Sequence, residues 1–514
     1  MQTKHNQAPI SSKEQGKDTV ILNEMKMNIE PNFDLENTNI SVEEIKAEAV
    51  KLTKNFDAIP HDEVLKQLLG QLKKVNFRDL AGLTDETDKL QKKHFSVLSI
   101  EQILDVAQQN DWGLCRSNGF IFLYNGAYWR LFDSDEVKAF LGDAAESIGV
   151  EKFDARYHKF RDDLYKQFIT VAHLPKPEQP HDMVLINLKN GTFEISPTKQ
   201  KLRNPDRADF LTYQLPFEYN PNAKAPMFKD YLNKVQPNIE RQNILAEYLA
   251  YVFIKPSTLK LEKALFLYGN GANGKSVFSD IVDKLLGADN VSHYSLGSIT
   301  DENGYHRAKL AGKLVNYSSE MNGKLEASIF KQMVTGEPVE ARLPYQEPFI
   351  MTDYAKLIFN CNELPKDTEQ THAFFRRFLI IPFDVTIPDD EQDKTLAQKI
   401  IDTELSGVFN WVLDGLKRLL AQKNFTNCES VKKQLEQYKK ESDSVQMFLE
   451  DENYTKAVND FKPLKDIYFD YKVYCNDNGD KACSLRTLAD RLRRVGYVTE
   501  KKNFGQAVYI AKRA

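Results

Sequence analysis

The sequence predicts an α/β protein whose main domain contains a mostly parallel sheet, and two patterns carry this prediction. Apolar strand-like runs alternate with helical stretches up to about residue 422, namely LEKALFLYG, KLVNYSS, AKLIFNCN and FLIIPF. A glycine-rich loop lies where the first of these runs meets a helix. A mixed α/β and helical region is expected before this domain, and a winged helix-turn-helix after it.

The chain begins with a segment that is too polar to fold by itself. Residues 1–40 are rich in Asn, Gln, Lys and Glu and contain too little apolar surface to offset the entropy lost on ordering. We therefore expect a flexible arm. Residues 41–112 show helical patterns, including an apolar stripe that contains Val64, Leu68 and Leu72, and we expect a helical preface there.

The pattern then becomes mixed. FIFLYNGAYWRLF and MVLINLKNGTFEI each predict a β-hairpin, with turns at Asn125-Gly126 and Asn190-Gly191. Helical stretches such as ILAEYLAYVFI lead into the main domain. The expected units are a mixed α+β region at 113–225, a helical connector at 226–257, the main domain at 258–422, and a linker helix with the winged helix at 423–514.

The composition excludes several classes of protein. No apolar run approaches the roughly 20 residues that a membrane span requires, and the N-terminus lacks the apolar core of a signal peptide, so we expect no membrane contact and a cytoplasmic location. The five cysteines are scattered, which predicts neither a disulfide framework nor a zinc site. The net charge is −5, yet residues 481–514 carry nine Lys and Arg against Asp490 and Glu500, a local basic patch that suits phosphate backbones.

The run ALFLYG leads directly into a phosphate-binding motif, G-x-x-x-x-G-K-S, and a helical pattern follows it. Glycines let main-chain N–H groups turn inward around a phosphate, and the helix N-terminus adds positive potential. Lys275 is expected to reach the β- and γ-phosphates of ATP, and the Ser276 hydroxyl to bind Mg²⁺. The residues expected to contact the nucleotide are Gly269, Asn270, Gly271, Ala272, Asn273, Gly274, Lys275, Ser276 and Val277.

Hydrolysis of ATP also requires a carboxylate near the γ-phosphate. The run LVNYSSE ends at Glu320, which we expect to share the Mg²⁺ with Ser276, although Ser319 stands where many such sites carry a second acid. The next run ends at Asn362, whose amide can hydrogen-bond the γ-phosphate or the attacking water. The alternatives are a solvated strand end for Glu320 and ordinary turn chemistry for Asn362.

Two arginines, Arg376 and Arg377, precede the last strand-like run. A guanidinium at such a position can project into the site of a neighbouring subunit and neutralise transition-state charge, so that hydrolysis depends on assembly. The alternative is a pair of surface arginines that make local salt bridges.

The ordered series GNGANGKS, LVNYSSE, FKQMVTGEPVEARLPYQEPF, LIFNCNELP and FFRRFLIIPF resembles the superfamily 3 helicases, an AAA+ group, and more narrowly the helicase portion of the phage and plasmid primase-helicase family. The resemblance covers roughly residues 113–514 and includes a C-terminal winged helix. It implies an AAA+-type P-loop ATPase at 258–422 that assembles as a homo-oligomer, a hexameric ring, and unwinds DNA during replication of a phage, plasmid or other mobile element. Such a protein would act in the cytoplasm of a bacterial or phage-infected cell.

The resemblance also implies a DNA-contacting hairpin in the central channel of the ring, with Lys331, Arg342 and Tyr345 as candidates. The alternative is that Arg342 and Tyr345 only stabilise the hairpin. Basic residues of the C-terminal helix and wing are further candidates for DNA binding, with a solvated helix face as the alternative. These residues are Arg486, Arg491, Arg493, Arg494, Lys501 and Lys502.

No primase centre is expected in this chain. The nearest approach to a carboxylate cluster is Asp133-Ser134-Asp135, where Asp135 is interpreted as the N-cap of a helix. A primase would therefore be a separate protein.

Two functions fit these observations. The first is an ATP-dependent helicase that acts on single- and double-stranded DNA with ATP and Mg²⁺. The alternative is an ATP-controlled origin-binding initiator or helicase loader without processive unwinding.

Overall fold

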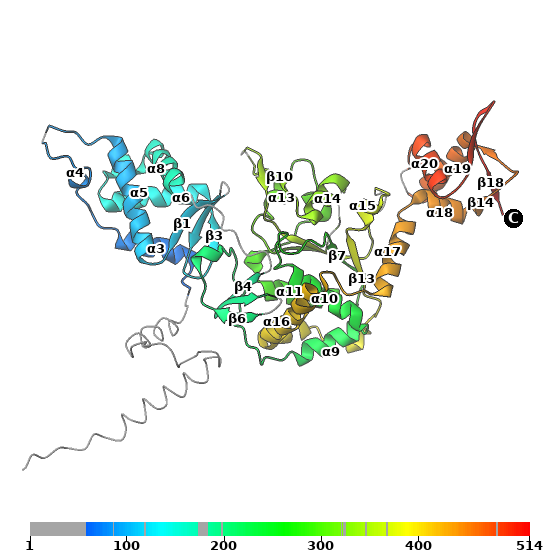
Figure 1. The fold of residues 1–514 in the computed structure, drawn as a ribbon, viewed down its shortest axis with the longest axis horizontal. Helices are drawn as coiled ribbons and strands as arrows, with labels where there is room; N and C mark the ends of the chain where they lie inside the picture. Colours follow the sequence, from blue (N-terminus) through cyan, green and yellow to red (C-terminus); the bar gives the residue numbers. More distant parts are fainter. Residues whose placement is uncertain are drawn as a thin grey trace, which may run out of the picture. The chain divides into compact units, whose positions relative to one another are not determined.

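The computed structural model describes residues 58–85, 87–117, 120–172, 183–196, 199–319, 321, 325–344, 347–365, 369–479 and 482–513 (Figure 1). The arm expected at 1–40 and the first part of the helical preface lie outside these residues. Within the described ranges, no helix has the length and apolar character that crossing a membrane requires. The buried apolar residues gather into four main hydrophobic cores along the chain.

The first core joins helices to a three-stranded antiparallel sheet of order β1-β2-β3. Leu68, Ile103, Leu141 and Leu164, from four different helices, are fully buried in it. The boundary expected at 112/113 runs through this core, because apolar side chains of the helices before it and of the strands after it pack together. The elements are α3 (His61–Gln71), α4 (Phe77–Leu80), α5 (Lys92–Gln109), β1 (Gly113–Ser117), β2 (Phe120–Tyr124), β3 (Trp129–Phe132), α6 (Ser134–Ile148), α7 (Lys152–Arg156) and α8 (His158–Val171).

The helix after β3 begins earlier than the sequence suggests. Its N-cap is Asp133, whose carboxylate accepts a hydrogen bond from the Asp135 N–H, so Asp135 lies inside α6. The N-cap interpretation therefore applies to Asp133 and was wrong for Asp135. Both expected hairpins form, β2 with β3 and β4 with β5. In the second hairpin Leu188 pairs with Gly191, so its two-residue turn begins one residue earlier than expected.

The second antiparallel sheet, β4-β5-β6, shares a core with the main domain. Ile186, Leu188 and Phe193 are buried in this core together with residues of the parallel sheet and its helices. The boundary expected at 225/226 therefore does not separate two cores. The elements are β4 (Val184–Leu188), β5 (Gly191–Ile195), β6 (Gln200–Arg203), the short η1 (Arg207–Asp209), α9 (Pro226–Val235) and α10 (Ile239–Tyr251).

A five-stranded parallel sheet organises the main domain, as expected. Its strand order is β13-β7-β12-β9-β8, and every neighbouring pair is parallel. The strands are buried on both faces, so they read as continuous apolar runs. Its elements are β7 (Ala264–Tyr268), α11 (Lys275–Leu286), η2 (Ala288–Asn290), β8 (Val291–Ser292), α12 (Leu296–Ile299), α13 (Tyr305–Ala308), β9 (Val315–Ser318), α14 (Ala327–Thr335), β10 (Val339–Ala341), β11 (Phe349–Met351), β12 (Lys356–Cys361), α15 (His372–Phe375), β13 (Phe378–Pro382), η3 (Asp389–Glu391) and α16 (Leu396–Gln422).

Alternate residues of β7 face different helices. Leu265 and Leu267 lie in the core that contains α9, α10, α11 and α16, whereas Ala264 and Phe266 lie in the core that contains α14. Helices therefore cover both faces of the sheet. The first strand in sequence, β7, lies between β12 and β13, so its carboxyl end opens at a point where the strand order reverses. Such a switch point is the usual ligand crevice of open α/β sheets.

Buried acidic side chains hold the helices around this crevice. Glu247 of α10 is fully buried, pairs with Arg418 of α16 at 3.1 Å and accepts the Thr426 N–H at 2.7 Å. Glu404 of α16 accepts the first N–H groups of α9 and so caps it across the chain. Gly415 allows α16 to touch α10, because a Cβ there would lie 2.5 Å from the Ala246 carbonyl carbon.

The expected linker helix packs against the sheet domain. Tyr438 of α17 is buried against Phe375 and Phe378, and its hydroxyl donates to the Pro365 carbonyl at 2.8 Å. The fourth core begins after this helix. The elements are α17 (Glu429–Glu441), α18 (Ser444–Asp451), β14 (Tyr454–Lys456), β15 (Lys462–Pro463), α19 (Leu464–Asp477), α20 (Leu485–Arg494), β16 (Thr499–Lys502), β17 (Gly505–Val508) and β18 (Ile510–Lys512).

Candidate nucleotide site and subunit-edge arginines

The glycine-rich motif forms the loop between β7 and α11 at the carboxyl edge of the parallel sheet. Gly274 ends the loop with a φ of 85°, in the left-handed region that favours glycine. A Cβ at Gly274 would lie 2.6 Å from Cγ1 of Val235, so a side chain there would also collide with α9. A Cβ at Gly269 would lie 2.5 Å from the Phe383 carbonyl oxygen. Both glycines are therefore required by close packing as well as by the turn.

The loop presents a set of hydrogen-bond donors. Among the described residues, the main-chain N–H groups of residues 270–276 donate to no protein acceptor. They lie where the N-terminus of α11 contributes positive potential. The donor set and the glycine-lined cradle fit a phosphate group. The Ser276 hydroxyl, in the exposed first turn of α11, is a chemically suitable oxygen ligand for Mg²⁺.

The Lys275 ammonium group binds the carbonyl groups of its own loop. Its Nζ donates to the Gly269 carbonyl at 2.5 Å, the Asn270 carbonyl at 3.2 Å and Oδ1 of Asn273 at 3.1 Å. Burial lowers the pKa of Lys275, because the charged form is partly removed from water. These acceptors hold the charge in place, and a bound phosphate would offer the ammonium group a stronger, anionic partner.

Two further side chains support the loop. Nδ2 of Asn273 donates to the carbonyl groups of Asn270 and Phe383, which ties the loop to the end of β13. The buried Tyr231 hydroxyl of α9 donates to the Gly274 carbonyl at 2.7 Å. Sequence reasoning included Asn273 but missed Tyr231, because a contact across 43 positions leaves no local signal in the sequence.

One of the predicted polar residues of the neighbouring strands, Asn362, lies at the same edge of the sheet. Asn362 follows β12, which pairs with β7, and the Gly269 N–H donates to the Cys361 carbonyl at 3.1 Å. The exposed Asn362 is therefore next to the start of the loop. Glu320 lies outside the described residues. The strand before it, β9, lies parallel to β12 and ends at this edge.

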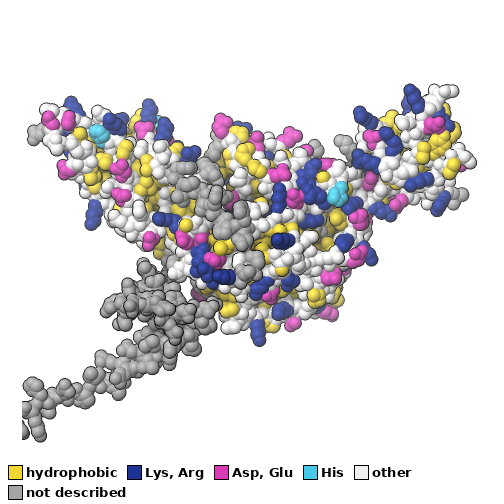
Figure 2. Space-filling view, in the orientation of Figure 1, with side chains coloured by type: hydrophobic (Ala, Val, Ile, Leu, Met, Phe, Trp, Pro, Cys, Tyr) yellow, Lys and Arg dark blue, Asp and Glu magenta, His cyan; other side chains and the backbone are white. Residues whose placement is uncertain are grey.

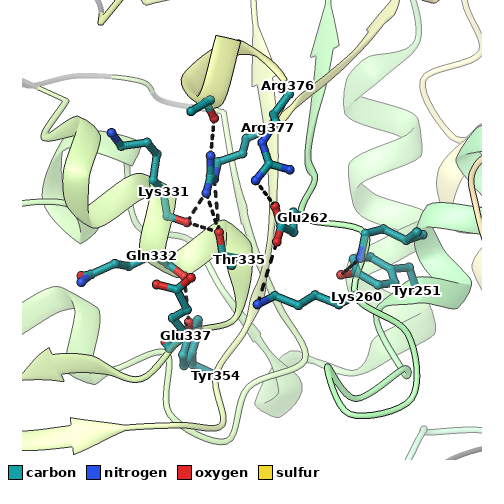
Figure 3. A network of polar contacts seen from close by, with 12 residues as sticks. Tyr251, Lys260, Glu262, Lys331, Gln332, Thr335, Glu337, Tyr354, Arg376 and Arg377 are labelled. Carbon is teal, nitrogen blue, oxygen red and sulfur yellow. Dashed lines mark hydrogen bonds and ion pairs between the residues drawn. The ribbon is translucent and has the colours of Figure 1, made fainter. Parts of the chain in front are cut away.

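The paired arginines take different environments (Figure 3). Arg377 is buried, and its guanidinium donates to Oγ1 of Thr335 at 2.8 Å, to the Lys331 carbonyl at 3.2 Å and to the Ala373 carbonyl. Arg376 is partly exposed and forms an ion pair with Glu262, which also lies 3.9 Å from Lys260. Arg377 is thus engaged in contacts inside the domain, whereas Arg376 lies at the surface.

Both arginines lie at the amino edge of the sheet, because they precede β13 while Glu262 precedes β7. The glycine-rich loop follows β7 at the opposite edge. Five strand residues at about 3.3 Å each separate the edges by roughly 16 Å. Arg376 is therefore not part of the glycine-rich loop of the same chain. The sequence analysis did not identify Glu262, because nothing near it in the chain marks it as a partner of Arg376.

The candidates between the second and third motifs are spread over two elements. Lys331 lies on α14 and pairs with Glu369 at 2.7 Å, so its charge is engaged inside the subunit. Arg342 follows β10, in the exposed connection of the β10–β11 hairpin, where the resemblance implies a hairpin. Tyr345 lies outside the described residues.

The C-terminal basic residues also differ among themselves. Arg491 is largely buried and pairs with Asp443 at 3.1 Å, and Lys502 lies with its Nζ 3.9 Å from the centre of the Phe461 ring. Arg493 pairs with Asp490 one turn earlier on α20. Three of the candidates are exposed and make no such contact in the described part of the chain: Arg486, Arg494 and Lys501.

Two parts of the chain match known protein families. Residues 101–237 match the family described as "D5 N terminal like", and residues 267–377 match a family of unknown function, DUF5906. "Putative helicase 121R" of Invertebrate iridescent virus 3 is 24% identical over 343 residues, which are 59% of this chain and 36% of that protein. The chain thus spans about a third of the length of this relative.

Among solved structures, "The apo structure of NrS-1 C terminal region (305-718)" matches with 13% identity and a TM-score of 0.45, covering 81% of this chain and 99% of that one. A second structure of the same region matches with 13% identity and a TM-score of 0.44, covering 80% and 98% of the two chains. With the D5 N-terminal-like match and the viral relative, the resemblance to the phage primase-helicase family is confirmed. The chain is therefore similar to helicase-related proteins.

Proposed function

We propose that this chain is an ATP-dependent DNA helicase of superfamily 3, which assembles as a hexameric ring and unwinds DNA during replication of a phage, plasmid or other mobile element. One observation carries the proposal. Lys275 and a set of main-chain amides without a protein acceptor in the described part of the chain lie between β7 and α11, at the carboxyl edge of a parallel sheet and beside Asn362. This arrangement suits the binding and cleavage of a nucleoside triphosphate such as ATP.

The residues of this edge have separate roles in the proposal. The loop amides and Lys275 bind and orient the phosphates, and Asn362 orients the attacking water or contacts the γ-phosphate. Ser276 and Glu320 would hold Mg²⁺, which supplies positive charge to the phosphate oxygens. The catalytic contribution of the protein is positioning and charge stabilisation, because phosphoryl transfer requires little covalent chemistry from side chains.

The proposal assigns the arginine that acts between subunits to Arg376. Arg377 is fully engaged with Thr335 and neighbouring carbonyl groups, which makes it a residue that supports the edge. The exposure of Arg376 at the edge opposite its own loop favours action on a neighbouring subunit in a ring. Release from Glu262 would be part of that action.

The DNA contacts are assigned to exposed basic residues. Arg342, with Tyr345, would contact a DNA strand in the channel, while Lys331 holds Glu369. In the C-terminal unit, α20 followed by the β16–β17 hairpin supports a winged helix-turn-helix. Arg486, Arg494 and Lys501 are its best placed DNA contacts, on grounds of exposure. A separate primase remains the proposed partner.

Lys275→Ala tests the proposal. The variant should lower ATP hydrolysis by about a hundredfold to a thousandfold, because it removes a preorganised positive charge from the developing phosphate charge. The circular dichroism spectrum should not change. Lys284→Ala is the matched control, since Lys284 is an exposed lysine of the same helix, and should keep full activity. Normal turnover by Lys275→Ala would remove the loop from the mechanism.

Strand displacement on a forked duplex tests the second half of the proposal. Wild type with ATP and Mg²⁺ should separate the strands, and Lys275→Ala should not. ATP hydrolysis without strand separation would instead favour an initiator or loader, which uses ATP to control assembly.

A further inference from the structure

Exposed apolar side chains gather in the C-terminal unit. Val458, Phe461, Val498 and Phe504 are 87%, 41%, 62% and 52% exposed. Their segments are joined by main-chain hydrogen bonds, from Tyr509 to Val498 and from Ile510 to Asp460 among others. In Figure 2 hydrophobic side chains adjoin Lys and Arg on the visible face of this unit.

Phe461 and Phe504 form a stacked pair within this region. Their ring centres lie 6.0 Å apart, and the ring planes differ by 11°. Phe504 occupies the second position of the two-residue turn between β16 and β17, since Lys502 pairs with Gly505. Phe461 immediately precedes β15, which pairs with β17. The two near-parallel rings therefore lie together at the end of a hairpin, with Phe504 in its turn.

The pair is fixed in place on one side. Lys502 extends its Nζ to 3.9 Å from the centre of the Phe461 ring, and Tyr509 contacts the same ring edge-on at 5.9 Å. Lys502 also lies 3.5 Å from Glu500. These contacts order Phe461, whereas Phe504 stacks on it and leaves half of its surface exposed. A hairpin that only needed stability would gain little from this exposed ring, because a turn position favours polar residues and glycine.

The charges around the pair indicate its ligand. Lys501 and Lys502 directly precede the turn, and residues 481–514 carry nine Lys and Arg against Asp490 and Glu500. A polyanion with flat rings is complementary to this combination of positive charge and aromatic surface. Bases inside a duplex are covered by their neighbours, so only an unpaired base can offer its face to Phe504.

We propose that Phe461 and Phe504 form a stacking platform for an unpaired nucleobase, with Lys501 beside the phosphates of the same strand. The proposal rests on the proposed function in that it assumes DNA as the substrate, but it concerns a site separate from the phosphate-binding loop. It assigns to the hairpin the recognition of single-stranded DNA, as at the mouth of a fork, in addition to contacts with the duplex backbone.

The test compares two strands of equal charge. Fluorescence anisotropy measures the affinity of the full chain for oligodeoxythymidylate and for an abasic strand of the same length. Phe504→Ala should weaken binding of oligodeoxythymidylate by about tenfold and leave the abasic strand unaffected, because only the former stacks. Phe504→Trp should restore the preference. Lys501→Ala should weaken the binding of both strands alike.

The control is Phe153→Ala, because Phe153 is a 79% exposed phenylalanine of another unit and should not affect either strand. Equal binding of oligodeoxythymidylate by wild type and Phe504→Ala would overturn the platform, as would equal losses on both strands. Those results would leave the helicase proposal intact and would point to a protein partner for the patch. Conversely, a base-dependent loss in Phe504→Ala together with full ATP hydrolysis by Lys275→Ala would support the platform and refute the proposed motor.

Discussion

The two edges of the parallel sheet each contain a lysine that is withdrawn from water, yet they differ in what surrounds it. At the amino edge, Lys263 donates to the carbonyl groups of Arg376 and Phe378, and burial, with the charges of Arg376 and Lys439, lowers its pKa to about 8. At the carboxyl edge, Lys275 also donates to carbonyl groups and also has a lowered pKa. A buried lysine is therefore no sufficient mark of a functional site.

The difference lies in the neighbouring backbone. The glycine-rich turn before Lys275 contains main-chain N–H groups that donate to no protein acceptor in the described part of the chain, whereas the carbonyl groups that bind Lys263 belong to the start of an ordinary strand. The carboxyl edge can therefore receive an anion, whereas the amino edge supports Arg376 and Glu262 at the surface. This difference supports our proposal that the carboxyl edge binds a nucleotide and that the amino edge contacts a neighbouring subunit.

Of the substitutions that test this comparison, Arg376→Ala should have the largest effect on ATP turnover. If Arg376 acts on a neighbour, ATP turnover by the assembled protein should fall by about a thousandfold, because a trans-acting arginine contributes that order of rate enhancement. Mixing Arg376→Ala with Lys275→Ala subunits should recover activity, since some interfaces then combine an intact loop with an intact arginine. Lys260→Ala, a neighbouring surface lysine near Glu262, should retain activity. Absence of recovery in mixed rings would place Arg376 outside the catalytic interface.

Arg377→Met should lower the stability of the fold and leave the rate of ATP hydrolysis nearly unchanged. The substitution removes the hydrogen bonds to Thr335, Lys331 and Ala373, and we expect a loss of about 3 kcal/mol in the free energy of unfolding. Thermal and urea unfolding measure this loss, while turnover per folded molecule should change little. A stable Arg377→Met protein without ATPase activity would reverse the roles of the two arginines.

Tyr231→Phe should have the smallest effect, and it is confined to the carboxyl edge. It removes the hydrogen bond to the Gly274 carbonyl, worth about 1 kcal/mol, and should weaken ATP binding by roughly fivefold. Equilibrium binding of a fluorescent ATP analogue measures the change. Tyr157→Phe, at an exposed tyrosine remote from the loop, should bind ATP as wild type does. A similar loss in both variants would mean that Tyr231 does not support the loop.

The parallel sheet was accessible from the sequence because its strands are buried on both faces and therefore read as apolar runs. The glycine-rich loop between β7 and α11 was accessible because its glycines, lysine and serine follow a fixed spacing between a strand-like run and a helical pattern. The different environments of Arg376 and Arg377 were not accessible from the sequence. They depend on Glu262 and Thr335, which folding brings near from elsewhere in the chain. The core shared by α3, α5 and β1–β3 was also hidden, because a change from helical to strand pattern does not mark a domain boundary.

The strand β13 connects the two edges directly. Arg376 precedes it, and at its other end the Phe383 N–H donates to the Tyr268 carbonyl while the Phe383 carbonyl accepts from Asn273, which also binds Lys275. If Arg376 contacts a neighbouring protomer as proposed, its displacement would reach Lys275 through the extended residues of β13 and through Asn273. In a closed ring each protomer would connect to its neighbour in this way. Hydrolysis at one nucleotide site would then affect the site in the next protomer. Amide hydrogen exchange at residues 378–383, compared in wild type and Arg376→Ala on assembly, would register this mechanical relay.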